Sequence, residues 1–160
     1  MTDLAFDLSP TESREVSPQA RSYVAFVVHG RNFALPIEDV REIRAWSGTT
    51  QLPKAPPYVM GVMNLRGSIV PIVDVAARFN IGQAQPTPTH VVIVSAIGTR
   101  PVGLLVDAVS DIIDTEPSDL RPVPEEAVQD SDGLAGLLTY KNLLVALIDV
   151  PKLAADAASL

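Results

Sequence analysis

One stretch decides the fold: Gly61-Val62-Met63-Asn64-Leu65-Arg66-Gly67-Ser68-Ile69-Val70-Pro71-Ile72-Val73-Asp74-Val75-Ala76-Ala77-Arg78-Phe79. Two short apolar runs flank an Arg-Gly corner, the second run ends on an aspartate, and a helical pattern follows. Short β-rich runs around a glycine predict a hairpin, and an aspartate before a helical pattern predicts an N-cap. The stretch therefore predicts a strand, a tight turn, a second strand and a short capped helix.

Three further pairs of apolar runs lie on either side of this stretch. Each pair is joined by residues that tolerate a positive φ or otherwise favour tight turns. The pairs are Tyr23–Val28 with Phe33–Leu35, Val91–Ala96 with Val102–Val106, and Leu134–Tyr140 with Leu143–Ile148. The pattern predicts an all-β protein with short helices, and strands this short favour two small packed barrels over an open sheet.

The segments between the hairpins carry weaker signals. Charged and apolar residues alternate from Arg41 to Trp46, which predicts a half-buried strand with Ile43 on the opposite face from Glu42 and Arg44. The other expected elements are a helical turn over Ile37–Val40, a short helix from Pro57 to Met60, a strand over Val109–Ile113 and a helix after Asp149.

The composition indicates one compact unit. The chain has 160 residues, of which 47% are apolar, and this is enough for one sizeable core. Residues 1–20 mix Ser, Thr, Pro and Glu with few large apolar groups, so they are expected to form a disordered tail. The folded domain is expected over residues 21–155, with a short tail over residues 156–160.

Charge and cysteine content exclude several classes of function. The net charge is −7 and the basic residues are scattered, which argues against binding to nucleic acid or to anionic membranes. There is no cysteine, so disulfides and thiolate chemistry are excluded. The sequence carries neither a secretory signal pattern nor an apolar run of about 18 residues, and the expectation is a soluble cytoplasmic protein without membrane insertion.

Three aspartates, Asp74, Asp107 and Asp149, each end an apolar run and could be interpreted as an acid/base or metal centre. The favoured interpretation is that Asp74 and Asp149 cap the helices that follow and that Asp107 satisfies a turn. His29 and His90 lack neighbours at metal-ligand spacing, and Asp130–Gly133 departs from the pattern of a calcium loop. Neither a nucleophile elbow nor a phosphate-binding loop occurs, so no catalytic residue, metal or cofactor is predicted.

Arg66 is the charged residue with the most informative position. A guanidinium at a hairpin corner is either a solvated turn residue or the partner of a carboxylate across a barrel mouth, and Glu42 is the expected partner. Ile37, Val40, Ile43, Val102 and Leu104 are each either core residues or members of a groove that accepts a partner.

The central stretch resembles the signature of the CheW family of chemotaxis coupling proteins, Gly-x-x-Asn-Leu-Arg-Gly followed by Ile/Val-x-Pro-x-x-Asp. Other segments are similar to the family's recurring segments and occur in its order: Val40-Arg41-Glu42-Ile43, Leu52 to Gly61, Val102 to Val109, and Arg121-Pro122-x-Pro124. The resemblance covers about residues 21 to 155. No kinase, phosphotransfer or response-regulator segment accompanies it, unlike in CheA or CheV.

The resemblance implies two intertwined five-stranded SH3-like barrels and a non-catalytic adaptor. Its partners would be the cytoplasmic tip of chemoreceptors and the regulatory domain of the histidine kinase CheA, in arrays at the membrane, with the adaptor monomeric when alone. The residues implied for receptor binding are Ile37, Val40, Glu42, Ile43, Arg66 and Val102. Kinase contacts are implied loosely at Gly98, Val102 and Gly103, and Asn64, Gly67, Asp74 and Asp149 are expected to be structural.

Coupling would then operate through binding geometry, because a receptor shift changes how the kinase domains pack. Modest interfaces suffice, since an array raises the effective concentration of each partner. Three alternatives remain open: an adaptor of the same fold in a twitching-motility or surface-sensing pathway, a small barrel enzyme that uses the three aspartates, and a generic peptide-binding barrel.

Overall fold

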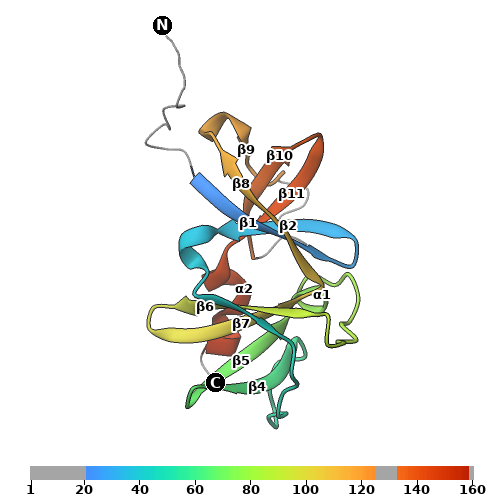
Figure 1. Ribbon diagram of the computed structural model, residues 1–160, viewed down its shortest axis with the longest axis vertical. Helices are drawn as coiled ribbons and strands as arrows, with labels where there is room; N and C mark the ends of the chain where they lie inside the picture. The colour runs from blue at the N-terminus through green and yellow to red at the C-terminus, as the bar shows by residue number, and fades with distance from the viewer. Residues whose placement is uncertain (1–20, 125–132, 159–160) are drawn as a thin grey trace, which may run out of the picture.

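The computed structural model describes residues 21–124 and 133–158, and it contains two β-sheets (Figure 1). The predicted tail over residues 1–20, and residues 130–132 of the segment compared above with a calcium loop, lie outside the described residues. The first sheet has six strands in the order β8-β1-β2-β11-β10-β9. Their bounds are β1 Arg21–Val28, β2 Arg31–Pro36, β8 Ala108–Thr115, β9 Leu120–Arg121, β10 Leu134–Tyr140 and β11 Leu143–Ile148.

The second sheet has five strands in the order β3-β6-β7-β5-β4. Their bounds are β3 Glu42–Ala45, β4 Val59–Leu65, β5 Ser68–Asp74, β6 Val91–Ile97 and β7 Arg100–Val106. The short helical elements are η1 Ile37–Asp39, α1 Val75–Arg78, η2 Pro117–Asp119 and α2 Val150–Ala158. The four predicted hairpins are confirmed as β1–β2, β4–β5, β6–β7 and β10–β11.

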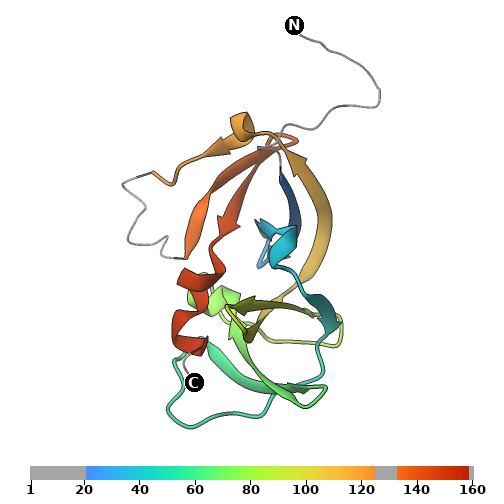
Figure 2. The same ribbon diagram turned by 90° about the vertical axis from the view of Figure 1, so that its left-hand side faces the viewer.

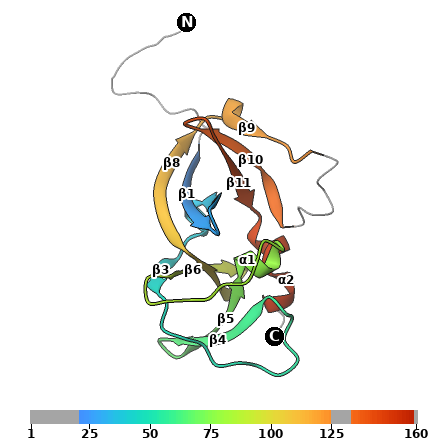
Figure 3. The same cartoon turned by 90° about the vertical axis from the view of Figure 1, so that its right-hand side faces the viewer.

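The chain passes between the sheets more than once. It begins in the six-stranded sheet, builds the whole five-stranded sheet from β3 to β7, and returns to the six-stranded sheet at β8. Helix α2 then packs against β5, β6 and β7 (Figures 2 and 3). Leu153 and Ala157 of this helix are buried in a core cluster that also contains Phe26 and Leu104, so one core joins the two sheets.

Three expectations about the elements are wrong. No helix begins at Pro57, because Val59 already enters β4 and its N–H donates to the carbonyl of Pro56. Helix α2 continues to Ala158, past the expected boundary at residue 155, because Ala157 is part of the core. The two sheets do not have five strands each, since the two-residue β9 adds a sixth strand to the first.

The three aspartates each satisfy backbone N–H groups, as predicted. Asp74 accepts hydrogen bonds from the N–H of Ala77 at 3.3 Å and of Ala84 at 2.9 Å. Asp149 accepts one from the N–H of Lys152 at 3.1 Å, and Asp107 accepts one from the N–H of His29 in the β1–β2 turn at 2.9 Å. Within residues 21–124 and 133–158, no three His, Asp or Glu side chains are grouped to hold a metal ion.

We expect the Asp74→Ala variant to lose about 1–2 kcal/mol of unfolding free energy. The reason is that Asp74 is 6% exposed and its two carboxylate oxygens bind two separate backbone N–H groups. Urea denaturation followed by circular dichroism measures the change. Glu38→Ala is the control, because the Glu38 side chain is 59% exposed and pairs with the similarly exposed Arg21, and an equal loss in both variants would contradict the capping role.

Candidate protein-interaction surface

The corner of the β4–β5 hairpin presents Arg66 to solvent. Arg66 and Gly67 have φ angles of 52° and 86°, as a two-residue hairpin turn requires. The side-chain oxygen of Asn64 accepts a hydrogen bond from the N–H of Gly67 at 2.9 Å. Asn64 and Gly67 therefore fix the conformation of the corner that carries the guanidinium.

Arg66 pairs with Glu42, the partner expected from the sequence. One guanidinium nitrogen of Arg66 donates to Oε2 of Glu42, and Nη1 of Arg44 lies 3.6 Å from Oε1 of the same carboxylate. The Glu42 side chain is only 22% exposed, whereas that of Arg66 is 74% exposed. The glutamate is therefore a partly shielded anchor, and the arginine remains available to a partner.

The ion pair links the two edge strands of the five-stranded sheet. Glu42 lies on β3 at one edge, while Arg66 ends the hairpin that contributes β4 at the other edge. A second link is the backbone bridge between Thr50 and Val62, in which each N–H donates to the carbonyl of the other residue at 2.9 and 2.8 Å. The side-chain pair and the bridge together hold the edges near each other.

Strand β3 presents its apolar side chain to solvent instead of burying it. The predicted strand is confirmed as β3, with Ile43 on the opposite face from Glu42, but Ile43 is 47% exposed, so the interpretation of Ile43 as a core residue is wrong. The burial is reversed because Arg66 covers the face that carries Glu42, whereas Ile43 is on the other face of an edge strand. Ile37 in η1 is 39% exposed and is not a core residue either, whereas Val40 is partly buried and packs against the core cluster.

Val102 and Gly103 do not belong to an accessible surface. Val102 is 0% exposed within the core, as is Leu104, and we therefore remove Val102 from the predicted binding residues. A Cβ atom at Gly103 would lie 2.5 Å from Cδ1 of Ile72, so the role of this glycine is close packing. Gly98 is exposed in the β6–β7 turn and stays a predicted contact position.

Several exposed apolar residues were missed by the sequence reasoning. Ile112 of β8 is 56% exposed and Ile69 of β5 is 60% exposed. The sequence Asp111-Ile112-Ile113-Asp114 carried a usable signal, because two adjacent strand residues cannot both face one core. Ile113 is the buried member of this pair, and Ile112 is left on the surface beside β1.

One carboxyl group near this surface has a shifted pKa. Burial of Asp39 in η1 raises its pKa, and the neighbouring charge of Glu38 raises it further. The ionised form is therefore disfavoured in the folded state, and the contribution of Asp39 to stability falls as the pH rises through its pKa.

Within the described ranges, no helix is long and apolar enough to cross a membrane.

Comparisons with known proteins agree on one family. Residues 22–158 match the family model of the CheW-like domain. The chain is 41% identical to the chemotaxis protein CheW of Rhizobium meliloti strain 1021, over 86% of this chain and 90% of the relative. A more distant relative is the protein FrzA of Myxococcus xanthus, at 28% identity over 69% of this chain and 71% of FrzA.

A solved structure has the same architecture. The crystal structure of the scaffolding protein TtCheW from Thermoanaerobacter tengcongensis superposes with a TM-score of 0.76 at 27% identity, covering 87% of this chain and 90% of that one. None of these relatives is named as an enzyme. The family model, the 41% identity and the shared fold establish that this chain belongs to the CheW family of chemotaxis scaffold proteins.

Proposed function

We propose that this protein is a non-catalytic adaptor that couples the cytoplasmic tip of chemoreceptors to the regulatory domain of the kinase CheA. The observation that supports this most directly is the Arg66–Glu42 pair at the edge strand β3, which exposes Ile43 on its other face. A receptor hairpin that lies along this sheet edge would place an acidic side chain on Arg66 and apolar side chains against Ile43. Such a surface combines an apolar contact with a charge that selects the partner.

Glu42 acts as a positioning residue in this proposal. Its carboxylate, which is only 22% exposed, holds Arg66 and orients the guanidinium before a partner binds. A held side chain loses less conformational entropy on binding than a mobile one. Val40 and Ile37 extend the contact toward η1, and Val102 supports it only from the core.

The second partner needs a separate surface. We assign the kinase contact to the β6–β7 turn at Gly98 and to the exposed apolar side chain of Ile112 on β8. A location away from Arg66 would let receptor and kinase bind at the same time. The adaptor would then act at receptor arrays on the cytoplasmic side of the membrane, where many weak contacts combine.

We also propose that both sheets are the SH3-like barrels of the family. For the five-stranded sheet, this proposal is supported by the contacts between its edges, the Thr50–Val62 bridge and the Glu42–Arg66 pair. A second pathway fits the same surfaces. FrzA is among the relatives, which favours an adaptor of another chemosensory system as the alternative function.

Reconstitution tests the proposal. CheA is added to receptor-bearing membranes with and without this protein, and the rate of kinase autophosphorylation is measured. We expect activation only when the adaptor is present. Equal activity in its absence would contradict the coupling function.

We expect the Ile43→Asp variant to bind receptors at least tenfold more weakly, a loss of about 1.4 kcal/mol. A charge at this exposed apolar position has to be desolvated against the receptor, whereas the free protein leaves it in water. Co-sedimentation with receptor-bearing membranes measures the change. Leu143→Asp is the matched control, since Leu143 is also exposed, at 51%, but lies on β11 of the other sheet, and equal losses would contradict the assignment.

A further inference from the structure

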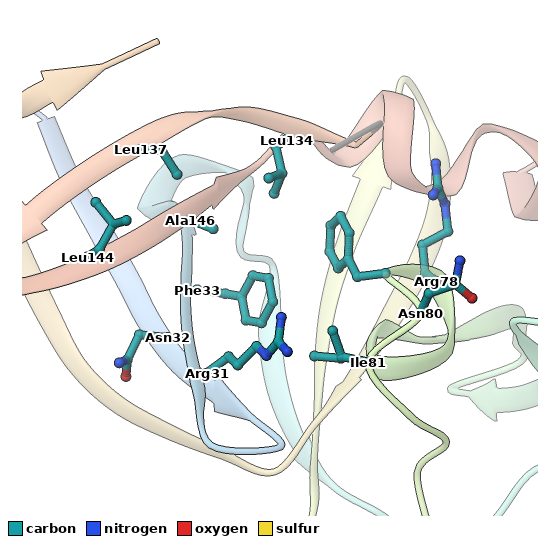
Figure 4. A pocket seen from close by; sticks show the side chains of 11 residues that line it. Arg31, Asn32, Phe33, Arg78, Asn80, Ile81, Leu134, Leu137, Leu144 and Ala146 are labelled. Atoms are coloured by element: carbon teal, nitrogen blue, oxygen red, sulfur yellow. The ribbon is translucent and has the colours of Figure 1, made fainter. Parts of the chain in front are cut away.

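A hollow of about 720 Å³ lies where the six-stranded sheet meets the end of α1 (Figure 4). The rings of Phe33, from β2, and Phe79, directly after α1, stack inside it with their centroids 5.3 Å apart. The rest of its apolar wall comes from Ile81 and from four residues of the β10–β11 hairpin: Leu134, Leu137, Leu144 and Ala146. None of these residues belongs to the surfaces assigned above to the receptor and the kinase.

The hollow exists because β2 and β11 pair over a short length. Their parallel register joins only Ala146 with Phe33 and Leu147 with Ala34. Leu137 of β10 is in register with Ala146, so Leu137, Ala146 and Phe33 form one row across three strands on the same face. Leu144 on this face is 61% exposed. An open apolar face of this kind is typical of a binding site for an apolar segment.

The rim of the hollow is basic in a chain whose net charge is −7. Arg31 at the start of β2 is exposed, and Figure 4 shows its side chain beside Phe33. Arg78 contributes a second guanidinium, which is held in place by a hydrogen bond from its Nε to the carbonyl of Leu153 at 2.9 Å. The charge and the apolar wall together fit a segment that carries both acidic and large apolar side chains.

We propose that residues Asp3–Leu8 of this same chain occupy the hollow. The sequence Asp3-Leu4-Ala5-Phe6-Asp7-Leu8 places large apolar residues at every second position. In an extended segment these three side chains share one side and can contact the apolar wall. The aspartates lie on the other side, toward the rim, where Asp7 pairs with Arg31.

The chain is long enough for this contact. Arg31 is in register with Val28 at the end of β1, so it lies about 23 Å, the length of that strand, from Arg21. The fifteen Cα-to-Cα steps from Phe6 to Arg21 reach up to about 50 Å when the segment is extended. The contact can therefore form within one molecule.

Occupation of the hollow would join the two sheets. Phe33 belongs to the six-stranded sheet, whereas Phe79 follows the helix that continues β5 of the other sheet. A segment packed against both rings restrains the arrangement of the sheets. The amino-terminal segment would then regulate how the two partner surfaces are presented relative to each other.

Disulfide cross-linking in the full chain tests the proposal. The chain has no native cysteine, so only the introduced cysteines can form a disulfide. Two variants are compared under the same mild oxidation: Phe6→Cys with Leu144→Cys, and Phe6→Cys with Ile69→Cys. Leu144 and Ile69 are 61% and 60% exposed, so the second pair controls for exposure. We expect the first pair to form an intramolecular disulfide at least tenfold faster, as measured by non-reducing gels and mass spectrometry.

The proposed pairing of Asp7 with Arg31 is tested in the first double variant, Phe6→Cys with Leu144→Cys. Arg31→Glu should slow formation of its intramolecular disulfide severalfold, and adding Asp7→Arg should restore the rate. Equal rates for the two cysteine pairs would overturn the proposal, as would insensitivity to Arg31→Glu. Disulfides formed mainly between two molecules would overturn the assignment to the same chain.

Discussion

Replacement of Gly61 by alanine is expected to lower the unfolding free energy by about 3–5 kcal/mol. Gly61 has a φ of 138°, and a Cβ atom there would lie 2.3 Å from the carbonyl oxygen of Thr50. That oxygen belongs to the backbone bridge with Val62, so it cannot move without breaking the link between the sheet edges. Urea denaturation followed by circular dichroism measures the loss.

Gly30→Ala separates the clash from backbone strain. Gly30 has a φ of 76°, and nothing lies within 4 Å of the position a Cβ would take. This control should cost only about 1–2 kcal/mol, the penalty for a left-handed residue. A loss at Gly61 no larger than that at Gly30 would mean that the Thr50–Val62 bridge yields easily, and would contradict its role in holding the edges.

Arg66→Glu is expected to reduce kinase activation on receptor membranes at least tenfold. The variant removes the exposed guanidinium and places a second carboxylate opposite Glu42, which repels the partner that Arg66 attracts. The fold should change little, because an exposed ion pair contributes at most about 1 kcal/mol to stability. The measurement is CheA autophosphorylation with receptors, beside circular dichroism of the free variant.

Arg44→Glu is the matched control for this prediction. It makes the same change in charge next to the same carboxylate but leaves the Arg66–Glu42 pair in place. The swapped variant, Glu42→Arg with Arg66→Glu, restores an ion pair without restoring the cation at the corner, so its kinase activation should stay low. Full activation by the swapped variant, or an equal loss with Arg44→Glu, would contradict the assignment of Arg66.

The four hairpins could be predicted because each combines apolar runs with turn residues that need a positive φ, as at Arg66-Gly67 and Lys141-Asn142. The Arg66–Glu42 pair was one of the two interpretations that the sequence allowed for Arg66, since Glu42 is a carboxylate on a nearby predicted strand. Both features depend on residues that are close in sequence or on one complementary charge, so they can be predicted from the sequence alone.

The exposure of individual strand residues and the position of the hollow depend on tertiary contacts, which cannot be predicted from the sequence pattern. Val102 and Ile43 are both β-branched strand residues, yet one is fully buried and the other nearly half exposed. The difference arises because β7 lies in the middle of its sheet whereas β3 lies at an edge. Strand order also decides that β2 pairs with β11, which comes more than one hundred residues later, and this pairing creates the hollow beside Phe33.

The return of α2 to the five-stranded sheet affects how the protein is made. During translation, β3 to β7 emerge from the ribosome together, but Leu153 and Ala157, which complete the core beside them, are synthesised much later. Until that helix emerges, an apolar face of the nascent sheet remains exposed to water and to chaperones. The core that the two sheets share is therefore complete only after most of the chain has left the exit tunnel.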